Sequence, residues 1–95
     1  MYITLRKYRV NGSYEDLRKA VETGLMPILK ASPGFQAHWL MKCNDDDVAG
    51  LTLFDTKEHA EAALEKTLGW VANYARQVLV LPPNAMFGAE VEWFV

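Results

Sequence analysis

A histidine and a tryptophan stand next to each other at positions 38 and 39, in an apolar segment that follows the turn Ser32-Pro33-Gly34. A histidine can move protons near neutral pH, and a tryptophan can stack against an aromatic ligand. Adjacent residues of a strand point to opposite faces of the sheet, so the two side chains cannot share one small pocket within a subunit. If Trp39 faces helices, His38 faces a partner sheet, where a hydrogen-bonded interface role is favoured over that of a base.

Five positions, Trp39 among them, have side chains that suit a pocket for a small apolar or aromatic ligand. Aromatic rings would line such a pocket and a cation would stabilise an anionic ligand, and the residues of these types are Arg6, Trp39, Phe54, Trp70 and Tyr74. Trp70 and Tyr74 are four residues apart on a predicted helix, so their side chains can touch at a pocket rim or dimer contact. The competing explanation, which residue types alone favour, is that these aromatics fill the core.

Several other chemistries are disfavoured by the residues present. Cys43 is the only cysteine, so no internal disulfide or multi-cysteine metal site can form, and we expect a small core hydrophobe there. The run Asp45-Asp46-Asp47 lacks the spacing of a calcium-binding EF-hand and is predicted to be a solvated turn. His59 is predicted to be solvated too. We therefore expect neither a metal nor a cofactor.

The net charge of −2 provides no basic field for nucleic acid, which is not expected as a partner. No stretch approaches 18 consecutive apolar residues, so no membrane span is expected. The first seven residues alternate and lack the apolar run of a signal peptide, and the expected location is the cytoplasm.

The elements that must position these residues follow from hydrophobic periodicity. The 95 residues are expected to form one domain, spanning 1–95. Strands are predicted over 2–10, 35–43, 48–54 and 85–95. One helix begins at Ser13, is kinked by Pro27 and ends at Ser32-Pro33-Gly34; the second begins at 55–58 and is stopped by 82–84. The order predicts an α+β, ferredoxin-like βαββαβ fold: an antiparallel four-stranded sheet with both helices on one face.

The middle strands predict a homodimer because both of their faces are apolar. Pairing Met41 with Gly50 places Phe35, Ala37, Trp39, Met41 and Phe54 on one face and Leu40, Leu51 and Leu53 on the other. A slip of one residue moves Leu51 and Leu53 to the first face. Helices cover only one face, so a second copy is expected on the other. The dimer-face residues predicted in this way are His38, Leu40, Leu51 and Leu53.

Several short motifs resemble those of antibiotic-biosynthesis-monooxygenase-type domains, over nearly the whole chain. They are Ser32-Pro33-Gly34-Phe35, Leu53-Phe54-Asp55, the helix with Ala60, Ala62 and Ala63, Gly69-Trp70-Val71, and Leu81-Pro82-Pro83. The resemblance is greatest to a small, uncharacterised bacterial branch. It implies a dimeric α+β barrel, in which two ferredoxin-like sheets meet face to face. Members include cofactor-independent oxygenases of aromatic polyketides and haem-degrading enzymes.

The haem degraders of this type use an Asn, a Trp and a His, and the last two have no match here. Phe54 stands where their Trp ends the third strand, and Leu64 falls at the offset of their His, so the axial ligand for iron is missing. The resemblance then implies a homodimeric small-molecule-binding protein similar to cofactor-independent monooxygenases that act on aromatic or apolar substrates. The alternative is a non-enzymatic ligand-binding or assembly domain with the aromatics as core, and the sequence leaves open whether the protein is an enzyme.

Overall fold

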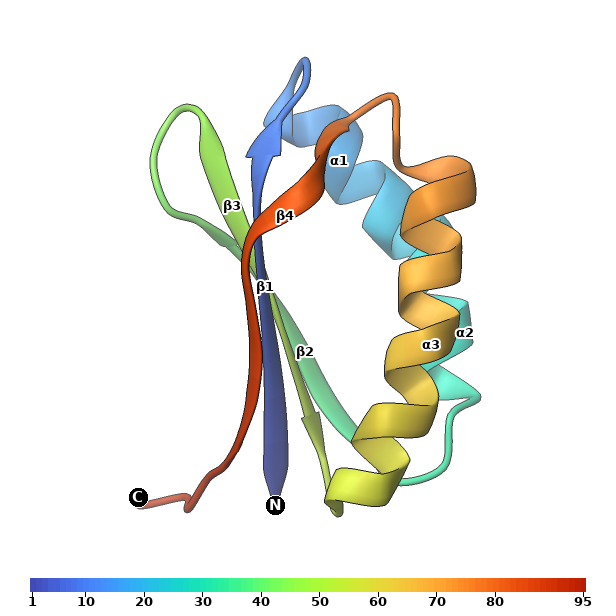
Figure 1. The fold of residues 1–95 in the computed structure, drawn as a ribbon, viewed down its shortest axis with the longest axis vertical. Coiled ribbons are helices and arrows are strands. Elements are labelled where there is room, and N and C mark those ends of the chain that lie inside the picture. The colour runs from blue at the N-terminus through green and yellow to red at the C-terminus, as the bar shows by residue number, and fades with distance from the viewer.

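Four antiparallel strands form one sheet in the computed structural model, which describes residues 1–95. The elements are β1 (Tyr2–Val10), α1 (Tyr14–Ala20), η1 (Val21–Leu25), α2 (Met26–Lys30), β2 (Phe35–Lys42), β3 (Asp47–Phe54), α3 (Lys57–Tyr74) and β4 (Leu79–Glu90). The strand order is β2-β3-β1-β4, and all helices lie on one face of the sheet (Figure 1). The predicted ferredoxin-like α+β fold is confirmed.

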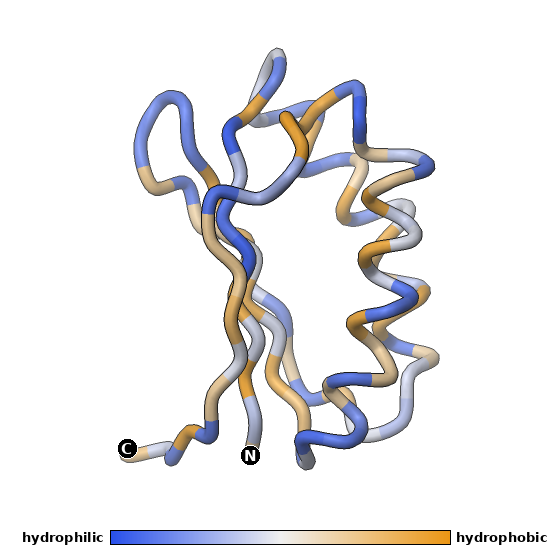
Figure 2. The backbone as a smooth tube through the Cα atoms, in the orientation of Figure 1, coloured by the Kyte–Doolittle hydropathy of each residue, from blue (hydrophilic) through white to orange (hydrophobic).

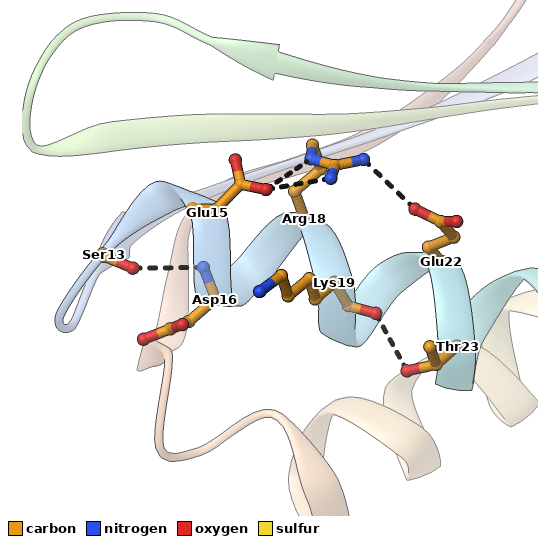
Figure 3. Close-up of polar contacts among 7 residues, drawn as sticks. All are labelled: Ser13, Glu15, Asp16, Arg18, Lys19, Glu22 and Thr23. Carbon is orange, nitrogen blue, oxygen red and sulfur yellow. Dashed lines mark hydrogen bonds and ion pairs between the residues drawn. The ribbon is translucent and has the colours of Figure 1, made fainter.

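The first helical segment begins where the sequence predicts. The Ser13 hydroxyl accepts a hydrogen bond from the Asp16 backbone N–H at 3.1 Å, which caps α1 (Figure 3). Arg18 donates to Glu15 at 2.8 Å and to Glu22 at 3.1 Å, so one side chain links α1 to η1. The hydrogen bond from Arg18 lowers the pKa of the Glu15 carboxyl. These groups are exposed, so the face that they form is a solvated one.

Pro27 changes the helix in a different way from the predicted simple kink. It has no N–H to donate, and the chain accommodates it with a five-residue π-helix, η1, directly before α2. The backbone N–H of Met26 bonds to the Val21 carbonyl, five residues back instead of four. The helix then ends at the predicted turn, where Gly34 has a φ of 77°.

The second helix is shorter than predicted. Its cap is Thr56, whose hydroxyl accepts from the His59 N–H at 3.2 Å, and not Asp55, whose carboxylate instead pairs with the exposed His59 ring at 2.7 Å. It ends at Tyr74, and β4 then contains Pro82 and Pro83. Prolines are tolerated there because β4 is an edge strand and its pairing with β1 is interrupted between Val80 and Ala85, so Pro82 and Pro83 are not among the paired residues.

The hairpin between β2 and β3 has the alternative register, one residue from the main prediction. Trp39 pairs with Leu51, Leu40 with Gly50 and Met41 with Ala49. The Asn44 side chain accepts from the backbone N–H groups of Asp46 and Asp47, both at 2.8 Å, and so closes the turn. Cys43 is exposed at its edge, and the prediction of a core cysteine is wrong. The loop is hydrophilic, in contrast to the strands (Figure 2).

The core lies between the sheet and the helices. The buried residues of α3 are Ala60, Ala63, Thr67, Trp70 and Val71. Trp70 therefore belongs to the buried stripe and is not at a pocket rim or dimer contact, whereas Leu64 and Leu68, which also have helical spacing, are half-buried. No helix combines the length and the hydrophobicity that crossing a bilayer requires.

Candidate functional site

Alternation along β1 directs Arg6 and Tyr8 toward the helices, into the core layer. Only 3% of Arg6 and 4% of Tyr8 is exposed. Arg6 makes no ion pair, and its Nε atom is buried without a hydrogen-bond partner. The Tyr8 hydroxyl is likewise buried and unpartnered. Charged side chains are rarely buried unless they are paired, so this arrangement calls for an explanation.

His38, on β2, lies near Arg6 and faces the helices in the same way. Its Nδ1 atom forms a hydrogen bond with the Thr52 hydroxyl at 2.9 Å. Between the two side chains lies Gly50, where a Cβ atom would be 3.3 Å from Arg6 Nη2 and 3.6 Å from His38 Cε1. A glycine at this position therefore leaves the space in which the arginine and the histidine approach each other.

The charge state of this cluster follows from its burial. Burial lowers the pKa of Arg6, yet a guanidinium keeps its proton in proteins. Burial, followed by the Arg6 charge, lowers the pKa of His38 to about 4, so the imidazole is neutral at pH 7. Burial raises the pKa of the Tyr8 hydroxyl. The cluster thus consists of the positively charged Arg6 and the neutral side chains of His38 and Tyr8, and it contains no carboxylate.

The depressed pKa of His38 predicts a pH-dependent stability. Between pH 6.5 and 4 the unfolded chain binds a proton at His38 that the folded protein does not, so stability falls as the pH falls. By linkage, the loss between pH 7 and pH 4.5 is about 2.5 kcal/mol. Urea unfolding at the two pH values measures it. His38→Gln should remove this part of the pH dependence and His59→Gln should retain it; an unchanged dependence in His38→Gln would contradict the assignment.

These side chains enclose a small cavity of about 30 Å³, here called the Arg6 cavity. Its sheet side includes Arg6, Tyr8 and His38, and its helix side includes Leu25, Trp70 and Val71. This volume holds a water or a molecule of two or three atoms, and it is too small for an aromatic ring.

A larger hollow adjoins the Arg6 cavity and is here called the Pro82 groove. It has a volume of about 380 Å³ and is lined by Tyr8, Leu68, Val71, Ala72, Leu81, Pro82 and Pro83. Tyr8 and Val71 line both spaces. The groove lies between α3 and the edge strand β4. It is an open surface groove whose volume and apolar lining fall within the range of small-molecule sites.

The residues predicted for a pocket are only partly brought together. Arg6 and Trp70 line the Arg6 cavity. Phe54 is buried in the core, where the centre of its ring lies 6.0 Å from that of Phe35. It lines neither the Arg6 cavity nor the Pro82 groove. Tyr74 is 73% exposed and also lines neither space. Trp39 lies on the opposite face of the sheet, because the register differs by one residue from the main prediction.

Of the four residues predicted for the dimer face, two lie on the outer face of the sheet and two lie on the helix side. Leu51 and Leu53 lie on the outer face of the sheet, opposite the helices. Leu51 is half-buried there, whereas Leu53 is only 6% exposed, near Val91 and Trp93 of the same chain. His38 and Leu40 face the helices and line the Arg6 cavity, so their predicted placement is wrong. Sequence reasoning also missed Tyr8 and Gly50. Tyr8 is two residues from Arg6 on one strand, and this spacing could have identified it.

The outer face of the sheet carries a continuous apolar row across all four strands. In pairing order the row consists of Phe87 on β4, Leu5 on β1, Leu51 on β3 and Trp39 on β2. Phe87 is 57% exposed and Trp39 41% exposed, and the two leucines between them are half-buried. A contiguous patch of this kind on a sheet face typically marks an interface.

No metal centre is evident, since no three histidine, cysteine, aspartate or glutamate side chains are grouped to hold an ion. No known protein-family model and no curated protein matches the sequence. The structure, by contrast, is similar to several solved structures.

Three of these structures are monooxygenases or oxygenases by description. A monooxygenase from the ActVA-Orf6 gene of Streptomyces coelicolor, solved with Nanaomycin D, is 12% identical, covers 99% of this chain and 89% of its own, and has a TM-score of 0.77. SnoaB, a cofactor-independent oxygenase from Streptomyces nogalater, is 13% identical over 99% and 95%, with a TM-score of 0.75. A Chloroflexus aurantiacus protein assigned to the antibiotic biosynthesis monooxygenases is 16% identical over 99% and 96%, with a TM-score of 0.69. The chain therefore has the antibiotic-biosynthesis-monooxygenase-type fold.

Proposed function

We propose that this chain is a homodimeric protein that binds a small apolar or aromatic molecule in the Pro82 groove and oxygenates it without a cofactor. The observation that carries the proposal is the buried, unpaired guanidinium of Arg6 beside an apolar groove. Burying a charge without a partner costs several kcal/mol, and such strained electrostatics are concentrated at functional sites. The fold is one on which cofactor-independent oxygenation occurs.

The chemistry requires an electron-rich ligand that can lose a proton. Oxygenation without a metal or flavin takes its electrons from the substrate itself, and an anion donates them more readily than the neutral acid. A positive charge a few ångströms away lowers the pKa of an acidic group on the ligand. Arg6 supplies this positive charge. Tyr8 separates Arg6 from the Pro82 groove, because it lines both the Arg6 cavity and the groove. Little water screens the charge in these buried surroundings.

The homodimer is supported by the apolar row on the outer face. A two-fold axis would place the row of one copy against the same row of the other, so each subunit covers its partner's exposed aromatic residues. The helices and both site spaces lie on the other side of the sheet and stay accessible in such a pair. Dimerisation and ligand binding are then compatible.

A second candidate function is ligand binding without catalysis. It is favoured by the burial of Phe54 and Trp70 in the core, where they pack instead of meeting a ligand. The two functions differ in one observable: only the oxygenase consumes dioxygen in the presence of a bound ligand.

Filling the Pro82 groove should abolish ligand binding. Ala72 is an exposed residue of the groove wall, and Ala72→Trp would place an indole in the space of the ligand. A thermal-shift panel of flat, ionisable aromatic compounds, including Nanaomycin D, should contain a compound that stabilises the wild type. At 100 times the dissociation constant the stabilisation is about 2.7 kcal/mol.

The matched control is Ala62→Trp, at an exposed position of the same helix outside the groove. It should retain the thermal shift that Ala72→Trp loses. An equal shift in both variants would place the ligand elsewhere, and a panel without any binder would count against the proposed function.

A further inference from the structure

The whole protein contains two buried side-chain polar atoms without a hydrogen-bond partner, and both belong to residues of the Arg6 cavity. They are Arg6 Nε and the Tyr8 hydroxyl oxygen. Buried polar groups are otherwise paired, as the Thr67 hydroxyl is with the Ala63 carbonyl at 2.9 Å. Unsatisfied hydrogen-bonding capacity is thus concentrated at one cavity, which indicates that something polar occupies it.

The polar groups around this cavity lack a negative charge. A guanidinium offers only N–H donors, and a tyrosine hydroxyl can donate as well. The remaining polar side chains are His38 and Trp70, whose indole N–H can only donate, and no aspartate or glutamate lines the cavity. A water molecule would satisfy the hydrogen bonds but leave the charge of Arg6 uncompensated. An anion does both, and the low local dielectric strengthens its attraction to the arginine.

We propose that the Arg6 cavity is a binding site for a small monovalent anion of one to three atoms, separate from the organic ligand in the Pro82 groove. The size limit follows from the volume of about 30 Å³, which excludes a carboxylic acid with a ring attached. Gly50 keeps this space open, because a Cβ there would approach both Arg6 and His38.

The site acquires a role in turnover if the proposed oxygenation holds, and this step rests on that function. A ligand CH₂ group first loses a proton to solvent water, and dioxygen takes the place of the small anion in the Arg6 cavity. The ligand anion in the groove then passes one electron to this dioxygen. The ligand becomes a radical and dioxygen becomes superoxide, a two-atom anion beside Arg6. The two radicals join through a carbon–oxygen bond, the peroxide takes up one proton, and loss of water leaves a carbonyl group. One dioxygen is consumed and one water is released.

Binding of azide and bromide tests the site without any organic ligand. Isothermal titration at low ionic strength should give one site per chain in the wild type, with affinity lowered at least tenfold in Arg6→Met. Arg9→Met is the matched control, because Arg9 is an exposed arginine of the same strand, and it should bind like the wild type. A crystal grown in bromide should show its anomalous signal inside the cavity.

Gly50→Ala provides a second variant that retains the arginine. Its added methyl group narrows the cavity and should weaken the binding of the three-atom azide at least tenfold. Equal binding by Arg6→Met and the wild type, or a cavity that holds water only in the bromide crystal, would overturn the proposal. The groove is tested separately by the Ala72→Trp variant, so failure of the anion site and failure of the ligand site are distinguishable.

Discussion

Replacing Phe54 by alanine is expected to lower the free energy of unfolding by about 3–5 kcal/mol. Phe54 is 1% exposed at the end of β3, and its ring meets that of Phe35 edge to face, at 6.0 Å and 68°. Removing it leaves a cavity where the sheet, the Pro33–Gly34 turn and the start of α3 converge. For a chain of this size, the loss is comparable to a large part of the total stability.

Urea unfolding at pH 7 measures this effect, with Phe94→Ala as control. Phe94 is 87% exposed, so its removal should change the monomer's stability by no more than about 0.5 kcal/mol. A Phe54→Ala variant that is as stable as the wild type but binds ligand differently would place Phe54 in the ligand site instead of the core.

Trp39→Lys is expected to convert the proposed dimer into a monomer. Trp39 lies at the end of the apolar row, where a charge would be buried between two sheets, and an uncompensated buried charge costs about 3–5 kcal/mol. In the monomer the side chain is 41% exposed, so a lysine there can reach water and the fold should survive. Sedimentation equilibrium at micromolar concentration should give twice 10.8 kDa for the wild type and 10.8 kDa for the variant.

The control for this experiment is Tyr74→Lys, which changes an exposed aromatic on the helix side of the molecule and should stay dimeric. The melting temperature of the wild type should also rise with protein concentration, because an obligate interface of about 2,000 Å² or more couples folding to pairing. A wild-type chain that sediments as a monomer would leave the row without a partner and contradict the dimer.

The order of elements could be predicted from sequence because each boundary has its own local signal. The Ser13 cap, the Ser32-Pro33-Gly34 turn and the alternation of β1 each depend on residues a few positions apart. Such signals need no knowledge of tertiary contacts, and all three are present in the structure.

The placement of His38 and Trp39 could not be decided in the same way. Both faces of β2 and β3 carry large apolar residues, so hydrophobic patterning does not distinguish two registers that differ by one residue. In the structure Lys42 pairs with Val48, and the hydrogen bonds of the Asn44 side chain close the turn of that register. The rotation of α3 could not be fixed for a similar reason, since apolar residues such as Leu64 and Leu68 stand beside its buried stripe.

Arg6 was predicted as a pocket residue from its type, but its burial without a hydrogen-bond partner for Nε could not be predicted from the sequence. Twelve acidic residues are present in the chain, and each of them is a potential partner until the fold is known. In the structure the acids of β3, α1 and α3 lie elsewhere, and the arginine shares its cavity only with neutral groups.

A crystal structure with the most tightly bound compound of the panel tests most directly the claim that the Pro82 groove holds the ligand. We expect the ring system between α3 and β4, in contact with Leu68, Ala72 and Pro82, with its ionisable group directed toward Tyr8 and the Arg6 cavity. A ring system bound on the outer face of the sheet, or at any site that does not touch the groove, would contradict it.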